Sequence, residues 1–281
     1  MKIRLSNTED GKKLIAFLSE QIDGLTLSIA EKQIKLGEVR VNGDKIRTNV
    51  CLKRGDEVSV FLPTNAIDVP DIKILYNDDN IIVAYKPLNV DTQNNLVRCL
   101  KRQLGFDVVP VHRLDRNTEG IVVLAKDAES ESILTEAIAN RGIVKIYRAL
   151  LYGKFERHEF ESRAYSVKDE KAAYVKVYAA PRKSAKEIVT KYKVVKEYDG
   201  YSDVEIELVT GRTHQIRAHS AFLSHPVLGD GKYGVSNINK RFGFKTQQLK
   251  AVKVVFGSLS GKLEYLNGKE ITIPSNTNIF D

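Results

Sequence analysis

The chain has 281 residues, of which 42% are hydrophobic and 28% charged, and 44 Lys and Arg outnumber 36 Asp and Glu to give a formal charge of +8. Its apolar runs fall short of the roughly 20 residues that span a membrane, and the first segment, MKIRLSNTEDGKK, lacks the apolar core of a secretory signal. Membrane and secreted classes are therefore excluded, and we expect a cytoplasmic protein whose charge favours a polyanionic partner. Cys51 and Cys99 indicate reduced thiols rather than a disulfide framework.

Residues 1–62 predict a small unit of two helices followed by a sheet. One helical face carries the apolar residues Leu14, Phe17, Leu18 and Ile22. Ser28 and Glu31 have the spacing of a capping box at the start of a second helix, and Gly37 is suited to end it. Asn42-Gly43 between short extended segments predicts a hairpin, and the alternation in 57–62 predicts a further strand.

Basic side chains are concentrated between residues 32 and 54 of this unit, where Glu38 and Asp44 are the only acidic residues. A concentrated patch is a better indication of nucleic-acid binding than a diffuse excess of charge. The alternative is a solvated surface with no partner. We expect RNA contacts from Lys35, Arg40, Lys45, Arg47, Lys53 and Arg54.

The remainder of the chain predicts an α+β domain over 72–281. Residues 63–71, PTNAIDVPD, hold two prolines and predict a linker before it. Helices are expected over 127–141, with Asp127 as the cap, and over 213–223. Strands are expected over 81–85, 121–125, 144–151, 173–178, 188–195, 204–209 and 249–255. This pattern favours a large, mixed but mostly antiparallel central sheet flanked by helices and loops.

A polar loop, PVHRLDRNTEG, leads directly into the strand predicted from Ile121. Asp115 lies in it between Arg113 and Arg116, and neighbouring positive charge lowers the pKa of a carboxylate and keeps it ionised. An ionised carboxylate on a loop at the end of a strand can act as a nucleophile. The alternative is a salt bridge that caps the strand and has no chemical role.

A second polar segment, TGRTHQIRAH, begins where the strand predicted over 204–209 ends, and HPVLGD follows at 225–230. Because the segment opens a predicted helix, its backbone N–H groups and positive dipole end suit a phosphate or a carboxylate. Taken alone, an ordinary strand-to-helix connection with a basic face is the more common explanation.

Together the two segments closely resemble the signatures of the RluA family of pseudouridine synthases. These signatures run H-R-L-D-x-x-T-x-G, then G-R-T-H-Q-I-R, then H-P-[I/V]-L-G-D. Here they stand as HRLDRNTEG (112–120), GRTHQIR (211–217) and HPVLGD (225–230), in the family order. The resemblance implies the pseudouridine synthase fold.

Two shorter segments extend this resemblance over most of residues 72–281. YKP (85–87) and KIYRAL (145–150) also look like the family. Residues 1–62 resemble the αL (ribosomal-protein-S-four-like) RNA-binding module that often precedes this catalytic domain. That association favours ribosomal RNA as the substrate, with transfer RNA as the alternative, and a monomer is the default expectation.

The resemblance implies an isomerase that converts uridine to pseudouridine without a cofactor or a metal. Asp115 corresponds to the catalytic aspartate, which attacks either the uracil ring or the anomeric carbon of the ribose; the sequence leaves both open. Tyr147 corresponds to the tyrosine that stacks on the extruded base and helps to remove the proton from carbon 5. Arg217 corresponds to the arginine that pairs with the catalytic carboxylate.

Four further residues near the two motifs are expected to bind RNA. Arg113 corresponds to the residue that fills the base stack after the target base leaves it. Arg212 is a candidate for binding a phosphate. His112 and His214 complete the set expected beside the active site.

Three other interpretations are weighed against this one. A non-catalytic RNA-binding factor has little need of Asp115, Tyr147 and Arg217 together. A glycosidase normally needs two carboxylates, and here Glu119 is a weak partner for Asp115. GDGKYG (229–234) fits G-x-G-x-x-G, but it lacks the preceding buried strand that a nucleotide cofactor needs.

Overall fold

The computed structural model describes residues 2–22, 25, 27–62, 71–169, 174–274 and 279–280. The chain divides into two compact units. One comprises Met1–Asp71 with Arg98–Gly105, and the other Ile72–Val97 with Phe106–Asp281. Apart from Asp71, the predicted linker lies outside the described residues. No helix in the described part of the chain is long and apolar enough to cross a membrane.

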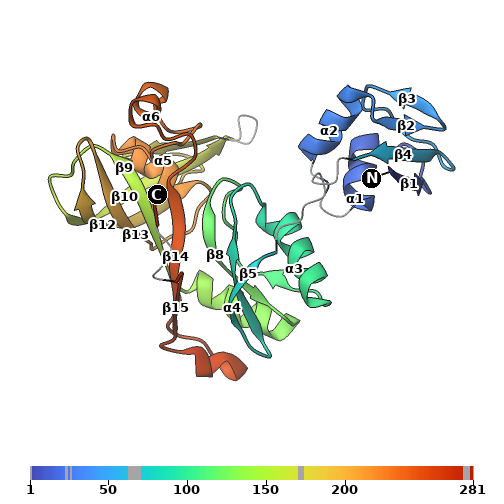
Figure 1. The fold of residues 1–281 in the computed structure, drawn as a ribbon. Coiled ribbons are helices and arrows are strands. Elements are labelled where there is room, and N and C mark those ends of the chain that lie inside the picture. The colour runs from blue at the N-terminus through green and yellow to red at the C-terminus, as the bar shows by residue number, and fades with distance from the viewer. Residues whose placement is uncertain are drawn as a thin grey trace. The chain divides into compact units, whose positions relative to one another are not determined.

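The N-terminal unit holds a four-stranded antiparallel sheet in the order β1-β4-β2-β3. Leu14 and Leu18 are fully buried in its core, as their helical spacing predicts. The elements are β1 (Lys2–Ser6), α1 (Leu14–Gln21), α2 (Leu27–Leu36), β2 (Val39–Val41), β3 (Asp44–Ile46), β4 (Glu57–Phe61) and α3 (Val97–Leu104). Figure 1 draws this unit in blue, with α3 in green.

Local signals in this unit are confirmed at two places and fail at one. Asn42 and Gly43 both have positive φ, 52° and 92°, and connect β2 to β3 as the hairpin prediction requires. Gly37, with φ 72°, follows the end of α2. The capping-box prediction is wrong, because Ser28 lies inside α2 rather than before it.

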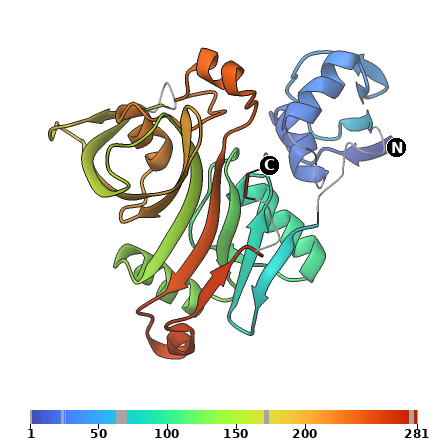
Figure 2. The same cartoon turned by 60° about the vertical axis from the view of Figure 1, so that its left-hand side comes forward.

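The larger unit is built on an eleven-stranded sheet in the order β11-β10-β12-β13-β9-β14-β8-β6-β5, with β15 paired to β14 and β7 to β8. Its described strand pairs are antiparallel except β14 with β8. The α+β prediction with a mostly antiparallel sheet is therefore confirmed. Figures 1 and 2 show β9 and β14 crossing the middle of the sheet side by side.

The strands of this sheet are β5 (Lys73–Asn77), β6 (Ile81–Lys86), β7 (Val109–Pro110), β8 (Glu119–Ala125), β9 (Ile143–Tyr152), β10 (Glu159–Asp169), β11 (Tyr174–Tyr178), β12 (Lys186–Glu197), β13 (Tyr201–Leu208), β14 (Leu249–Phe256) and β15 (Glu270–Thr272). The helices are η1 (Thr92–Leu96), α4 (Ala128–Ala139), α5 (Gln215–Phe222), α6 (Ser236–Phe242) and η2 (Gly261–Leu266). Asp127 caps α4, as predicted, by accepting a hydrogen bond from the Ser130 amide.

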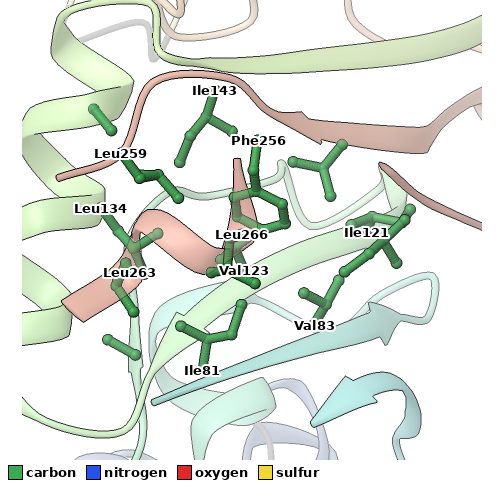
Figure 3. Packing of buried hydrophobic residues seen from close by; sticks show 14 of the residues in the cluster. Ile81, Val83, Ile121, Val123, Leu134, Ile143, Phe256, Leu259, Leu263 and Leu266 are labelled. Atoms are coloured by element: carbon green, nitrogen blue, oxygen red, sulfur yellow. The ribbon is translucent and has the colours of Figure 1, made fainter. Parts of the chain in front are cut away.

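A hydrophobic core fixes α4 and η2 against this sheet. Val83 of β6, Val123 of β8 and Phe256 of β14 are fully buried there, together with Leu134 of α4 and Leu263 of η2 (Figure 3). Strands buried in this way read as continuous apolar runs, which is why β6 and β8 are visible in the sequence. The core anchors β8, and the Asp115 loop leads into this strand.

Candidate active site

The Asp115 loop is held on both sides of the aspartate. The Thr92 hydroxyl donates to the carbonyl of Leu114 and accepts from its amide, both at 3.1 Å. After Asp115 the chain makes a tight turn, in which the amide of Thr118 donates to the Asp115 carbonyl at 2.9 Å. The Thr118 hydroxyl in turn accepts a hydrogen bond from the side-chain amide of Gln247, Nε2, at 2.7 Å. The backbone around Asp115 is therefore held by η1 before the aspartate and, after it, by the turn to Thr118 and its contact with Gln247.

Lys86, the lysine of the YKP segment, also braces this loop. Its side chain is fully buried, and its ammonium donates to the carbonyls of Pro87 at 3.0 Å, Val90 at 2.6 Å and Arg116 at 3.4 Å. Burial lowers the pKa of Lys86 to about 8, against the opposing effect of nearby carboxylates that include Asp115. The lysine thus ties the chain after β6 to the turn that follows the aspartate.

Gly120 explains why the motif ends in glycine. Its φ is +121°, and a Cβ there would lie 2.2 Å from the carbonyl oxygen of Ala251 on β14. Only glycine permits this close parallel approach of β8 to β14. The strand pairing places the Asp115 loop beside the start of β14.

Arg217 of α5 joins two carboxylates. Its Nη1 donates to Oδ2 of Asp115 at 2.8 Å, while Nε and Nη2 donate to the two oxygens of Asp230 at 2.6 and 2.9 Å. Burial opposes the charge on Asp230, but the bonds from Arg217 and from the amides of Lys232 and Tyr233 outweigh it and lower the pKa. Asp230 is thus a fixed anion that holds the guanidinium in place.

His214, at the start of α5, is the second neighbour of the aspartate. Its Nε2 lies 3.8 Å from Oδ2 of Asp115, and its Nδ1 lies 2.8 Å from the Tyr233 oxygen. The Val175 amide donates to that same oxygen at 2.9 Å, so the Tyr233 hydroxyl connects His214 to β11. Burial lowers the pKa of His214, and the charge of Asp115 opposes this shift.

Tyr147 of β9 lies in the wall of the same cleft, which has a volume of about 720 Å³. The tyrosine is 5% exposed. Burial raises its pKa, and the charge of Asp115 raises it further. A cleft of this size accommodates a nucleoside.

The sequence-predicted residues of the larger unit converge on this cleft. It is lined by Asp115, Tyr147 and Arg217 and by His112, Arg113, Arg212 and His214. Arg113 and Arg212 are exposed. The ring of His112 is fixed by β8, because its Nε2 accepts a hydrogen bond from the Val123 amide at 3.0 Å. Burial, and to a lesser extent the charge of Lys145, lower the pKa of His112 to about 3.

The remaining predicted RNA contacts belong to the N-terminal unit. Arg40 is half-buried, with its guanidinium 5.7 Å from the centre of the Phe61 ring. The others, Lys35, Lys45, Arg47, Lys53 and Arg54, are exposed. None of the six forms a side-chain ion pair within the described part of the chain.

Sequence reasoning missed four residues that build the site: Lys86, Thr92, Lys145 and Asp230. Three of them stand inside segments already singled out, YKP, KIYRAL and HPVLGD, so their position was the available signal. Thr92 carried no signal, because its role depends on a contact 22 residues along the chain.

The sequence was compared with those of known protein families. A sequence profile of the family described as RNA pseudouridylate synthase matches residues 80–222. The chain belongs to this family. It is an RNA pseudouridine synthase, an isomerase, and the resemblance to the RluA family seen in its motifs is confirmed.

Relatives of the synthase match over most of its length. The ribosomal large subunit pseudouridine synthase C of Escherichia coli K12 is 29% identical over 256 residues, covering 83% of this chain and 79% of that protein. The protein of the same name from Rickettsia conorii is 30% identical over 259 residues, covering 83% and 85%. An uncharacterized RNA pseudouridine synthase of Bacillus subtilis is 28% identical, covering 89% and 87%.

Solved structures show the same fold. Human RNA pseudouridylate synthase domain containing 1 superposes with a TM-score of 0.63 at 23% identity, over 73% of the synthase and 84% of the human chain. Human RNA pseudouridylate synthase domain containing 4 gives 0.59 at 24% identity, over 72% and 87%.

Proposed function

We propose that the synthase isomerises a uridine of large-subunit ribosomal RNA, with Asp115 as the nucleophile and the target nucleotide flipped into the cleft. The observation that carries this proposal is the state of the Asp115 carboxylate. Its Oδ2 accepts from Arg217, whereas its Oδ1 accepts no hydrogen bond from the described residues. The side chain is 20% exposed and lines the cleft. One oxygen therefore holds the carboxylate in place and the other is free to attack.

The reaction needs a bond to this oxygen and its later release. Attack on carbon 6 of the uracil, or on the anomeric carbon of the ribose, allows the bond between nitrogen 1 and the ribose to break. The base rotates, carbon 5 bonds to the ribose, the carbon-5 proton leaves, and the carboxylate departs unchanged. Arg217 balances the charge of the carboxylate when it departs.

Tyr147 supplies an aromatic face and a hydroxyl to this sequence. Its raised pKa keeps the phenol protonated at neutral pH. For Tyr147 to take the proton from carbon 5, its own proton has to pass to Asp115 or to water. The contribution of the hydroxyl is therefore separable from that of the ring, and a phenylalanine at this position tests it.

Base flipping is supported by the charge at the edge of the cleft. Unstacking a base costs a few kcal/mol. Arg113, two residues before the nucleophile, is exposed and can offset part of this cost by stacking in the vacated place. Arg212, also exposed, is placed to hold a phosphate of the flipped nucleotide.

Ribosomal RNA is favoured by two observations. The Escherichia coli and Rickettsia relatives are named for the large ribosomal subunit. The basic residues of the N-terminal unit, with no ion-pair partners among the residues described, suit contacts to the phosphates of a large folded RNA.

A glycosidase is disfavoured by the same geometry. Glu119 does not line the cleft, and its carboxylate is bound by the Tyr85 hydroxyl at 2.8 Å and by Lys250 at 3.2 Å. The side chain of Asp230 is completely buried, so it cannot reach a sugar. Glu207 does line the cleft, but its carboxylate is paired with Lys191 at 2.9 Å. None of these three carboxylates is therefore a free partner for Asp115.

The test is a map of pseudouridine in total RNA from cells with and without this protein, read by carbodiimide-dependent stops in sequencing. We expect one or a few positions in large-subunit ribosomal RNA to lose the modification in the deletion strain. Loss confined to transfer RNA would replace the proposed substrate. An unchanged map in both RNA classes contradicts the enzymatic proposal.

A further inference from the structure

A basic segment lies outside the active-site cleft and has no part in the mechanism above. From Gly231 to Lys250 the chain carries five cations and no Asp or Glu. Three of them, on and just after α6, are exposed and form no ion pair within the part of the chain described: Lys240, Arg241 and Lys245. Positive charge concentrated in this way attracts a polyanion.

Aromatic rings lie among these cations. Phe242 and Phe244, both half-buried, meet the ring of Tyr201 edge-on at 5.3 and 5.8 Å. Tyr198 extends the group by stacking on Tyr201 at 4.8 Å. The Arg241 guanidinium lies 5.2 Å from the centre of the Phe242 ring. Aromatic faces beside arginine and lysine are the combination on which unpaired bases stack.

The glycines of GDGKYG shape a hollow beside this group. A Cβ on Gly229, whose φ is +72°, would lie 1.8 Å from the Thr246 carbonyl oxygen, and one on Gly234 would lie 2.3 Å from that of Asp230. These two glycines therefore serve close packing of the loop rather than a nucleotide cofactor. The resulting cavity, about 550 Å³, is lined by Lys240, Phe244 and Lys245 among others.

Asp230 connects this hollow to the active site. Asp230 is one of the residues that line the cavity, and its carboxylate accepts a hydrogen bond from Arg217, which in turn donates to Asp115. A strand of RNA with its target nucleotide at Asp115 thus has a second basic surface close by. We call Lys240, Arg241, Phe242, Phe244 and Lys245 the α6 surface.

We propose that the α6 surface binds the unpaired RNA strand next to the target uridine, with the cations on its phosphates and Phe244 under a base. The proposal rests on the proposed function, because it assigns the flanking part of the same substrate. Unpaired RNA is favoured over duplex because the aromatic faces have a use only where bases are unstacked. A membrane surface is disfavoured, since the rings are half-buried against one another rather than projecting.

Binding is measured in the Asp115→Asn protein, which separates it from turnover. The variant Lys240→Ala/Arg241→Ala/Lys245→Ala is compared with its parent on a labelled stem-loop of large-subunit ribosomal RNA that contains the mapped uridine. Three lost contacts to single-stranded phosphates lower the slope of log K against log salt by about 2, which corresponds to roughly 50-fold weaker binding at 0.15 M salt. Phe244→Ala is expected to weaken binding about fivefold or more.

The matched control removes the same charge from the far part of the unit. Lys253→Ala/Lys262→Ala/Lys269→Ala alters three lysines on β14, η2 and the connection to β15, of which Lys253 pairs with Glu270 and Lys262 with Asp127. Strand β15 lies at the opposite end of this unit from α6 (Figure 1). We expect this variant to keep most of the affinity and the salt slope. Thermal unfolding verifies that every variant is folded.

Kinetics provide the second readout, in proteins that retain Asp115. The triple α6 variant is expected to raise KM and to leave kcat at saturating RNA within about twofold, because its side chains do not touch the reacting atoms. Unchanged affinity and salt slope overturn the proposal and point to another partner, such as an acidic protein. Equal losses in the control variant also overturn it. Wild-type protein that modifies no uridine refutes the proposed function. Binding is then measured on labelled large-subunit ribosomal RNA as a whole, and the affinities and salt slopes of the variants still test the α6 surface.

Discussion

Replacing Asp230 with asparagine tests whether this buried carboxylate positions the carboxylate of Asp115, the proposed nucleophile. Asp230 is 1% exposed and receives two hydrogen bonds from Arg217, at 2.6 and 2.9 Å. Asparagine keeps the shape but turns an N–H group toward one guanidinium nitrogen and removes the charge. Breaking a buried ion pair costs about 3–5 kcal/mol. We expect the free energy of unfolding to fall by about that amount in urea titrations.

The effect on activity should exceed the effect on stability alone. Arg217 also holds Asp115 at 2.8 Å, so a guanidinium released from Asp230 shifts the Asp115 carboxylate, and misplacing a reacting group by about 1 Å can cost roughly 100-fold in rate. Single-turnover assays with saturating enzyme measure this loss. Asp203→Asn is the matched control, because Asp203 is 7% exposed and bound through two nitrogens of Arg148 outside the cleft. The positioning role is refuted if Asp230→Asn reacts at the wild-type rate, or if both variants slow equally.

Further predictions concern a buried histidine, the tyrosine and a glycine. Burial lowers the pKa of His219 to about 4, so as the pH falls the unfolded state binds a proton before the folded state does. The contribution of neutral His219 to the free energy of unfolding is fully present above about pH 6.5 and falls by roughly 1.4 kcal/mol per pH unit toward pH 4. Denaturant titrations across that range should show a shallower fall in His219→Gln, although it is less stable throughout. Tyr147→Phe is expected to bind RNA normally but to react about 100-fold more slowly, and a wild-type rate would remove the hydroxyl from the mechanism. Gly229→Ala should lose at least about 2 kcal/mol through its φ of +72° and the 1.8 Å approach to Thr246; Gly231→Ala, where a Cβ meets open space, should lose far less, and equal losses would contradict this reading.

Much of the fold is predictable because its signals are local. Strands β6 and β8 are continuous apolar runs, and the Asn42-Gly43 turn and the Asp127 cap depend on neighbours in sequence. Strand β10 was missed because EFESRAYSVKD alternates weakly and most of its residues stay exposed or half-buried. Strand β1 was missed because it is a short edge strand whose pairing with β4 joins the start of the unit to its end. Helix α5 begins at Gln215, two residues later than predicted, because His214 has a φ of 51°.

The site was predictable in its residue types but not in its connections. Spacing and family motifs identified Asp115, Tyr147 and Arg217 as candidate site residues, and all three line one cleft in the structure. The second carboxylate on Arg217 was not foreseen, because the pairing with Asp230 is a property of how α5 and the 225–230 segment fold together. The buried Lys86 was overlooked for a related reason, since its partners are backbone carbonyls that no side-chain pattern records.

The central claim is that Asp115 carries out the chemistry while other residues bind the RNA. The most direct measurement uses the target RNA labelled with tritium at carbon 5 of uridine, mixed with excess wild-type or Asp115→Asn protein. Formation of pseudouridine expels that hydrogen, so the wild-type protein should release tritium into water. The variant should release none and bind the RNA with an unchanged Kd. Tritium release by Asp115→Asn at a rate near the wild type would contradict the account.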